Sequence, residues 1–145
     1  MLKNKIYIAS DHAGFELKTK LCQYFSDKAI AFIDLGTHIK SSCDYPDFAN
    51  LLALKIQNDD FGILICGSGI GISIAANRHK NIRCALCRDS LSASLARRHN
   101  DANVLALGAR FTAFEFAIDI IEHFINTSFD GGIHKDRIFK LEHLC

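Results

Sequence analysis

Hydrophobic and polar positions along this chain form blocks, in which short apolar runs are separated by longer segments with helical spacing. The apolar runs are KIYIAS (5–10), IAFIDL (30–35), FGILIC (61–66), IRCALC (82–87) and NVLALG (103–108). Their length and their content of β-branched and aromatic residues are typical of strands. FGILIC is continuously apolar, which indicates a strand that is buried on both faces. The pattern therefore predicts five strands.

The segments between these runs favour helices. Between residues 14 and 26, Phe15, Leu17, Leu21 and Phe25 lie close to helical spacing. Pro46, the only proline, suits the first turn of a helix that continues to residue 57. We expect further helices over 70–79, from a cap at 89 or 90 onward, over 112–126, and in a short final segment that ends at Cys145.

Strands that alternate with helices predict an α/β fold. We expect a single domain over residues 1–145: an open, doubly wound, Rossmann-like five-stranded parallel sheet with helices on both faces. In such sheets ligands bind beyond the carboxyl ends of the strands, where the strand order reverses. With the order 2-1-3-4-5, this point lies between the first and third strands. Asp11 and His12 follow the first strand, and Cys66 ends the third.

Composition narrows the possible partners. The chain has 145 residues, of which 49% are hydrophobic, and a formal net charge of +1, so a globular protein is expected. The balanced charge gives no electrostatic reason to expect nucleic acid or an anionic membrane as a partner. We find neither a signal peptide pattern at the N-terminus nor an apolar run of roughly 20 residues that would span a membrane. A cytoplasmic location is therefore expected.

The six cysteines of such a chain are expected to be free thiols. Cys84 and Cys87 have the spacing of redox and zinc motifs. Because residues three apart on a strand point to opposite faces, we interpret both as packing or surface residues. Cys22, Cys43 and Cys145 are interpreted in the same way.

Cys66 stands apart because the sequence GSGIG follows it directly. Several backbone N–H groups in a tight turn before a helix favour an anion, which could be a phosphate, a carboxylate or a developing enolate. A helix N-terminus also lowers the pKa of a cysteine, so Cys66 could act as a nucleophile or as a general base. The alternative is an ordinary buried cysteine at the end of a core strand.

We call residues 66–71, the end of the third apolar run and the glycines after it, the glycine corner. Three familiar glycine-loop motifs do not fit the sequence of this corner. A dinucleotide-binding fingerprint requires GxGxxG, normally after the first strand, and a Walker loop requires Gly-Lys-Ser/Thr. Position 72, where the lysine of a Walker loop or the arginine of a phosphotyrosine phosphatase loop would lie, is Ile72.

Five motifs in sequence order resemble those of the type B ribose-5-phosphate isomerases, whose superfamily includes the galactose-6-phosphate isomerase subunits. They are SDHAG (10–14), DYP (44–46), CGSGIGISIAAN (66–77), RRHNDANVLALGAR (97–110) and GGIHKDR (131–137). The resemblance spans nearly the whole chain. It implies the interconversion of an aldose phosphate and a ketose phosphate through a cis-enediolate, with no metal and no organic cofactor.

The resemblance also implies roles for residues of the corner. Cys66 corresponds to the catalytic base, since the position where other members carry a glutamate is Ile72. Ser68 would hydrogen-bond the reacting hydroxyl groups. The backbone of Gly67, Gly69, Ile70 and Gly71 would stabilise the enediolate, which suits the physics of preorganised N–H donors.

Other matched positions would hold the sugar. His99 corresponds to the acid that opens the furanose ring, and Asn100 to a substrate-contacting asparagine; the alternative for His99 is a histidine at the favourable end of a helix dipole. Asp11 and His12 correspond to a pair that meets the sugar, although Asp11 could instead cap a helix. Tyr45 either lines the pocket or is an ordinary loop residue.

Arg110 and Arg137 correspond to phosphate-binding arginines, because a guanidinium matches phosphate geometry. Surface solvation is the alternative for both. The tail motif of the family reads GGRHxxR, and Ile133 replaces its first arginine. His134 or Lys135 could compensate, and we expect the change to affect the affinity for substrate or the choice of sugar phosphate.

We therefore expect an isomerase that interconverts D-ribose 5-phosphate and D-ribulose 5-phosphate in the pentose phosphate pathway. The alternatives are a hexose-phosphate isomerase subunit acting on galactose or allose 6-phosphate, a non-catalytic sugar-phosphate-binding module and, less compatible with Ile72, a cysteine phosphatase. The resemblance implies a homodimer or a dimer of dimers with shared active sites. The tail over about 128–145 could then pack on a partner subunit.

Overall fold

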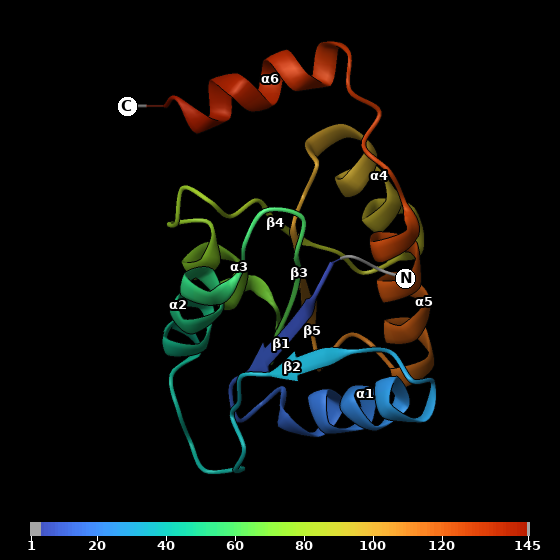
Figure 1. The fold of residues 1–145 in the computed structure, drawn as a ribbon. Coiled ribbons are helices and arrows are strands. Elements are labelled where there is room, and N and C mark those ends of the chain that lie inside the picture. Colours follow the sequence, from blue (N-terminus) through green and yellow to red (C-terminus); the bar gives the residue numbers. More distant parts are fainter. Residues whose placement is uncertain (1–3, 145) are drawn as a thin grey trace.

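The computed structural model describes residues 4–144, and Figure 1 shows a parallel sheet flanked by helices. The strands are β1 (Ile6–Ser10), β2 (Phe32–Asp34), β3 (Phe61–Cys66), β4 (Cys84–Leu86) and β5 (Val104–Gly108). All neighbouring pairs are parallel, in the order β2-β1-β3-β5-β4. The expected open five-stranded α/β sheet is confirmed. The expected end of the last helix at Cys145 lies outside the described residues.

The expected order 2-1-3-4-5 is wrong at one edge, because β5 lies between β3 and β4. The pairing of Cys66 with Gly108 brings the carboxyl ends of β3 and β5 together. All residues of β5 are buried, whereas the three residues of β4 are only partly buried. The longer, fully apolar strand is therefore central, and the short strand forms the edge.

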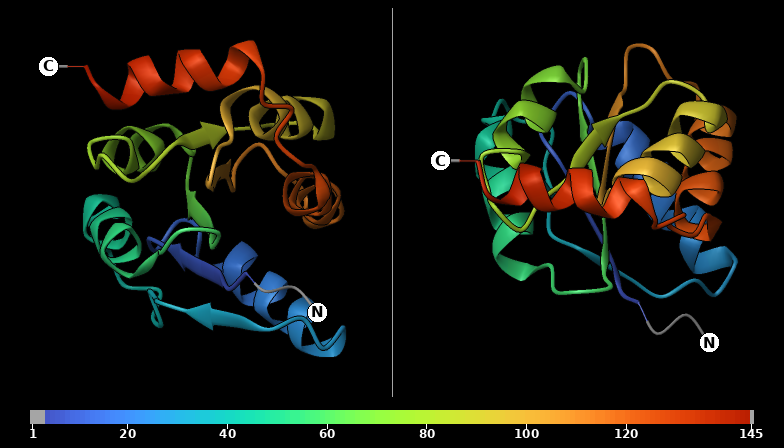
Figure 2. Two further views of the ribbon diagram at one scale, coloured as in Figure 1. Left: turned by 45° about the horizontal axis from the view of Figure 1, so that its top comes forward. Right: turned by 90° about the horizontal axis from the view of Figure 1, so that it is seen from above.

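The helices cover the sheet in two layers, which Figure 2 shows from two further directions. One layer contains α1 (Phe15–Asp27), α4 (Ser90–Asn100) and α5 (Phe114–Asn126), and the other contains α2 (Tyr45–Lys55) and α3 (Ile70–Ala76). Along β3, Ile63 and Ile65 pack toward the first layer, and Leu64 and Cys66 pack toward the second. This alternation follows from the two-residue period of a strand.

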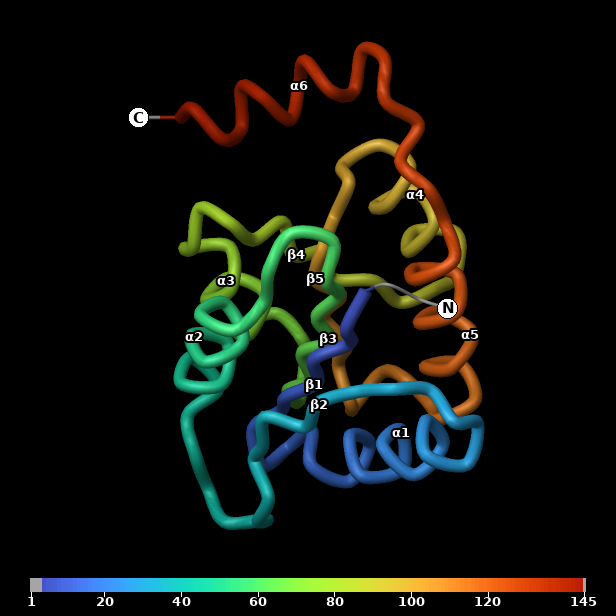
Figure 3. The backbone as a smooth tube through the Cα atoms, viewed as in Figure 1, coloured from blue at the N-terminus to red at the C-terminus, as the bar shows by residue number. Residues whose placement is uncertain are grey.

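The last helix, α6 (Ile133–Glu142), lies apart from both layers, at the end of the molecule where the strands begin (Figures 1 and 3). It packs against α4, and Ile138 is its buried residue. Ile133, Phe139 and Leu141 are large apolar side chains that are exposed on it. Among residues 4–144, none of the helices combines the length and the apolar character needed to cross a membrane.

Candidate active site

The chain turns sharply at Gly69, between the end of β3 and the start of α3. Gly69 has a φ of 78°, in the left-handed region that glycine adopts without strain. A Cβ at this position would lie 2.5 Å from Leu86 Cδ1 and 2.9 Å from the backbone nitrogen of Gly108. A larger residue would therefore be strained here and would also collide with β4 and β5.

This turn holds the thiol of Cys66, because the backbone N–H of Gly69 donates to Cys66 Sγ at 3.1 Å. The side chain of Cys66 is 4% exposed and packs under α2 and α3. The N–H of Ile70 donates to the Ser68 hydroxyl at 3.2 Å. Two of the expected anion-binding donors thus already contact Cys66 and Ser68, two of the three side chains with candidate catalytic roles.

A positive charge lies against Gly67, the residue that follows Cys66. The guanidinium of Arg110 covers Gly67, with Cζ 3.0 Å from the position that a Cβ on Gly67 would occupy. The Arg110 backbone N–H donates to the Gly67 carbonyl at 3.0 Å, which fixes the turn after β5 against the turn after β3. Among residues 4–144, the Arg110 side chain forms no ion pair, so its charge is available to an anion.

Tyr45, at the start of α2, covers the other side of the corner. Its ring atoms lie 2.6 to 2.9 Å from the position of a Cβ on Gly71, so only a glycine permits this contact. The tyrosine is partly exposed. Tyr45 is therefore a helix residue next to the glycine corner, a position from which it could line the predicted pocket.

Asp11 and His12 extend from the carboxyl end of β1 beside β3. Asp11 is buried; its N–H donates to the carbonyl of Ile65 at 3.2 Å, and its Oδ1 accepts from the N–H of Gly14 at 3.1 Å. Asp11 therefore holds the turn that leads into α1, but it is not the helix cap, because the N-cap of α1 is Gly14. His12 is exposed, and its Nδ1 lies 3.2 Å from the backbone nitrogen of Cys43.

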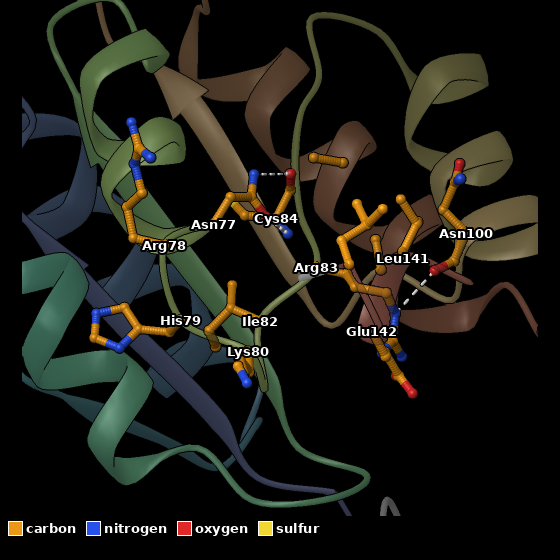
Figure 4. Close-up of a pocket in the computed structure, with 13 residues that line it drawn as sticks. Asn77, Arg78, His79, Lys80, Ile82, Arg83, Cys84, Asn100, Leu141 and Glu142 are labelled. Atoms are coloured by element: carbon orange, nitrogen blue, oxygen red, sulfur yellow. Dashed lines mark hydrogen bonds and ion pairs between the residues drawn. The ribbon is translucent and has the colours of Figure 1, made fainter. Parts of the chain in front are cut away.

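His99 and Asn100 lie near the amino ends of the strands, at the opposite end of the sheet from Cys66. Helix α4 begins beyond the carboxyl end of β4 and returns along its 11 residues toward the amino ends of the strands. At about 1.5 Å per residue, His99 is on the order of 15 Å from the carboxyl edge. The carbonyl of Asn100 accepts from Arg83 Nε, next to the amino end of β4, at 3.0 Å (Figure 4). A single chain therefore does not bring Cys66 and His99 together.

His99 belongs to a small polar cluster that the sequence did not predict. Its ring stacks on that of His134 with centroids 4.3 Å apart and an interplanar angle of 11°. Asp130 lies beside both rings, and its carboxylate pairs with Arg98 at 3.1 Å. Because the rings are nearly parallel, their in-plane nitrogen lone pairs do not converge on one point, which does not favour a metal ion. Arg137 is exposed on the neighbouring α6.

A cavity of about 750 Å³ lies at this amino edge, between the end of α3, the start of β4 and the overhanging α6 (Figure 4). Its lining includes the polar residues Arg78, His79 and Lys80 and the apolar residues Leu141 and Leu144. It lies beside Asn100 and is remote from Cys66.

Three other cysteines, Cys22, Cys84 and Cys87, lie in surroundings that disfavour the thiolate. Burial raises the pKa of Cys84 and of Cys87, and burial together with the charge of Asp34 raises the pKa of Cys22 to about 11. These thiols are poor sources of thiolate. The five described cysteines are free, and Cys145 is outside the described residues.

Comparison with known proteins identifies the family of this chain. Residues 6–141 match the family described as ribose/galactose isomerase. The chain belongs to this family. Ribose-5-phosphate isomerase B of Escherichia coli is 41% identical over 136 residues, covering 92% of this chain and 91% of that protein. A probable ribose-5-phosphate isomerase B of Mycoplasma pneumoniae is 46% identical, covering 97% and 94%.

Solved structures of the family have the same fold. A ribose 5-phosphate isomerase of Thermotoga maritima has a TM-score of 0.94 at 49% identity, covering 98% of this chain and 99% of that one. The Mycoplasma genitalium ribose-5-phosphate isomerase B, solved with bound ribulose-5-phosphate, has a TM-score of 0.93 at 40% identity, covering 98% and 96%. The family suggested by the five motifs is therefore confirmed.

Proposed function

We propose that the protein interconverts D-ribose 5-phosphate and D-ribulose 5-phosphate, as a step of the pentose phosphate pathway in the cytoplasm. The observation that carries this proposal is the Cys66 thiol, which accepts from the Gly69 N–H and precedes Gly67, the residue that the guanidinium of Arg110 covers. A potential base and a cation suited to phosphate thus lie at the same corner. The names of the relatives and the ribulose-5-phosphate in the M. genitalium structure support this substrate.

The chemistry requires one base and stabilisation of one developing negative charge. In the thiolate form, Cys66 takes the proton from C2 of the open-chain aldose, the C1–C2 double bond forms, and charge collects on O1. The donors of the corner and the Ser68 hydroxyl stabilise this enediolate. The proton then returns to C1, O1 takes a proton, and O2 gives one up as the ketose carbonyl forms. No electrons leave the substrate, so the reaction needs no oxidant or reductant.

We further propose that a second copy completes each site. His99, Asn100 and Arg137 would come from the partner of the chain that provides Cys66, Asp11, His12, Tyr45 and Arg110. In a two-fold dimer the same surface patches meet twice, so the amino edge of each copy can face the carboxyl edge of the other. The exposed apolar side chains of α6 and the cavity beneath it support such a contact. The assembly would be a homodimer or a dimer of dimers.

A hexose phosphate is a second candidate substrate because of Ile133. This side chain is exposed near the start of α6, at the position where the family motif has an arginine. With one guanidinium fewer, the phosphate subsite would rely on Arg110 and Arg137. Parallel assays with ribose 5-phosphate and galactose 6-phosphate would separate the two candidates.

The direct test is NMR of ribose 5-phosphate incubated in deuterated water with the metal-stripped protein. We expect ribulose 5-phosphate to form and deuterium to enter the exchanging position. Cys66→Ala should remove nearly all turnover and leave the circular dichroism spectrum unchanged. Binding without turnover in the wild type would identify a sugar-phosphate-binding module, and substantial turnover by Cys66→Ala would assign the base to another residue.

A further inference from the structure

One buried charge in this fold has no part in the proposed chemistry. Lys18, on α1, has a side chain that is 2% exposed, and its Nζ donates to Asp34 Oδ2 at 2.6 Å. Removing an ammonium group from water is costly unless a partner compensates the charge. Asp34 is that partner, and it lies at the end of the edge strand β2.

The other carboxylate oxygen of Asp34 holds the turn that follows β2. Asp34 Oδ1 accepts from the N–H of Gly36 at 2.9 Å. The carbonyl of Gly36 accepts from the N–H of Ser10 at 2.7 Å, and the N–H of Thr37 donates back to the carbonyl of Ser10 at 2.8 Å. Ser10 ends β1 and directly precedes Asp11 and His12. The turn and the substrate-binding segment are therefore joined by two hydrogen bonds.

The far end of the same loop returns to this segment. The N–H of Cys43 donates to His12 Nδ1 at 3.2 Å. Two residues later, the ring of Tyr45 covers Gly71. A continuous path of contacts thus leads from the buried lysine, through the loop of residues 36–44, to both His12 and Tyr45.

We propose that Asp34, held by Lys18, is a positioning residue that sets the loop 36–44 and, through it, His12 and Tyr45 against the glycine corner. Asp34 acts through the Gly36 N–H and does not touch the substrate. Its kinetic consequence rests on the proposed function, because His12 and Tyr45 affect KM only if they contact the sugar phosphate.

Two double variants isolate this role from the stability of the ion pair. Lys18→Met with Asp34→Asn removes both charges and keeps an oxygen acceptor for the Gly36 N–H. Lys18→Met with Asp34→Ala removes both charges and also the acceptor. Neither variant leaves an unpaired buried ion. A difference between them therefore measures the hydrogen bond that the side chain at position 34 accepts from the Gly36 N–H.

Glu16→Gln is the matched control. Glu16 on α1 pairs with Lys40 of the same loop, also at 2.6 Å, but the two side chains are 73% and 65% exposed. Exposed ion pairs contribute little because water solvates and screens them. This variant should leave both the loop and KM unchanged.

Two measurements test the proposal: amide hydrogen exchange of residues 36–44 without substrate, and steady-state kinetics with ribose 5-phosphate. The loss of one hydrogen bond corresponds to roughly threefold to tenfold in an equilibrium. We expect the alanine double variant to exceed the asparagine one by about this factor in KM and in loop exchange, with kcat and the exchange of α5 unchanged.

Equal loop exchange in the two double variants would overturn the proposal, whether or not the protein turns over this sugar. Equal KM values would overturn its kinetic part. If Glu16→Gln raised loop exchange and KM as much as the alanine double variant does, the proposal would also be overturned, because the exposed Glu16–Lys40 ion pair would then hold the loop. Absence of turnover in the wild type would refute the proposed function instead, and the exchange measurement would still stand.

Discussion

Replacing Gly69 by alanine is a sharp test of how tightly the corner is built. The substitution forces an L-residue to a φ of 78°, which costs about 1–2 kcal/mol. The new Cβ also lies 2.5 Å from Leu86 Cδ1 and 2.9 Å from the Gly108 nitrogen, and overpacking of this kind costs about 1–3 kcal/mol. Gly69→Ala should therefore lower the free energy of unfolding by about 2–5 kcal/mol, within the roughly 5–15 kcal/mol typical of a domain.

Gly131→Ala provides the matched control. Gly131 has a φ of 69°, and a Cβ there would meet nothing within 4 Å, so only the backbone cost of about 1–2 kcal/mol applies. Both substitutions reduce the entropy of the unfolded chain equally, and this contribution cancels in the comparison.

Urea unfolding followed by circular dichroism measures both variants, at one protein concentration because assembly contributes to stability. Gly69→Ala should also lose turnover in the fraction that remains folded, because the N–H that donates to Cys66 is displaced. Equal destabilisation by the two substitutions would refute the claim that β4 and β5 close around this turn.

Three further predictions concern the site and the half-buried thiol of Cys22. His99→Asn should slow turnover of cyclic ribose 5-phosphate more than that of an open-chain analogue; equal losses would argue against ring opening by His99. Ile133→Arg should lower KM for ribose 5-phosphate in steady-state assays, and an unchanged or higher KM would indicate a site adapted to isoleucine. Burial and the charge of Asp34 raise the pKa of Cys22 to about 11, so the folded protein keeps this proton longer than the unfolded chain. The free energy of unfolding should therefore fall as pH rises from about 9 to about 11; Cys22→Ala should flatten this fall in urea titrations, and an unchanged slope would contradict the assignment.

The strands could be predicted because burial from both sides leaves uninterrupted apolar runs, as in FGILIC and NVLALG. Their order could not, because the pattern within a strand reports its burial and not its neighbours. β5, and not β4 as expected, lies next to β3, because the longer apolar run of β5 pairs with β3 along its length. The point between β1 and β3 where the order reverses is unaffected by this exchange.

The distance between Cys66 and His99 was implicit in the predicted elements. A helix that follows a parallel strand returns toward the amino edge, so a residue at its end lies far from the carboxyl edge. The burial of Lys18 could also be predicted from the sequence, since Lys18, Leu21, Cys22 and Phe25 share one helical stripe. The stacking of His99 on His134 could not be predicted in this way, because it depends on how α6 docks against α4.

Subunit complementation tests most directly the central claim that Cys66 of one copy works with His99 of another. The Cys66→Ala and His99→Asn proteins, each impaired with ribose 5-phosphate, are mixed in equal amounts, allowed to exchange subunits, and assayed with this sugar. Half of the dimers should be hybrids with one intact site of two, which restores about a quarter of wild-type activity. If mass spectrometry shows hybrids but activity stays at the mean of the two parent variants, both residues act within one chain and the account is contradicted.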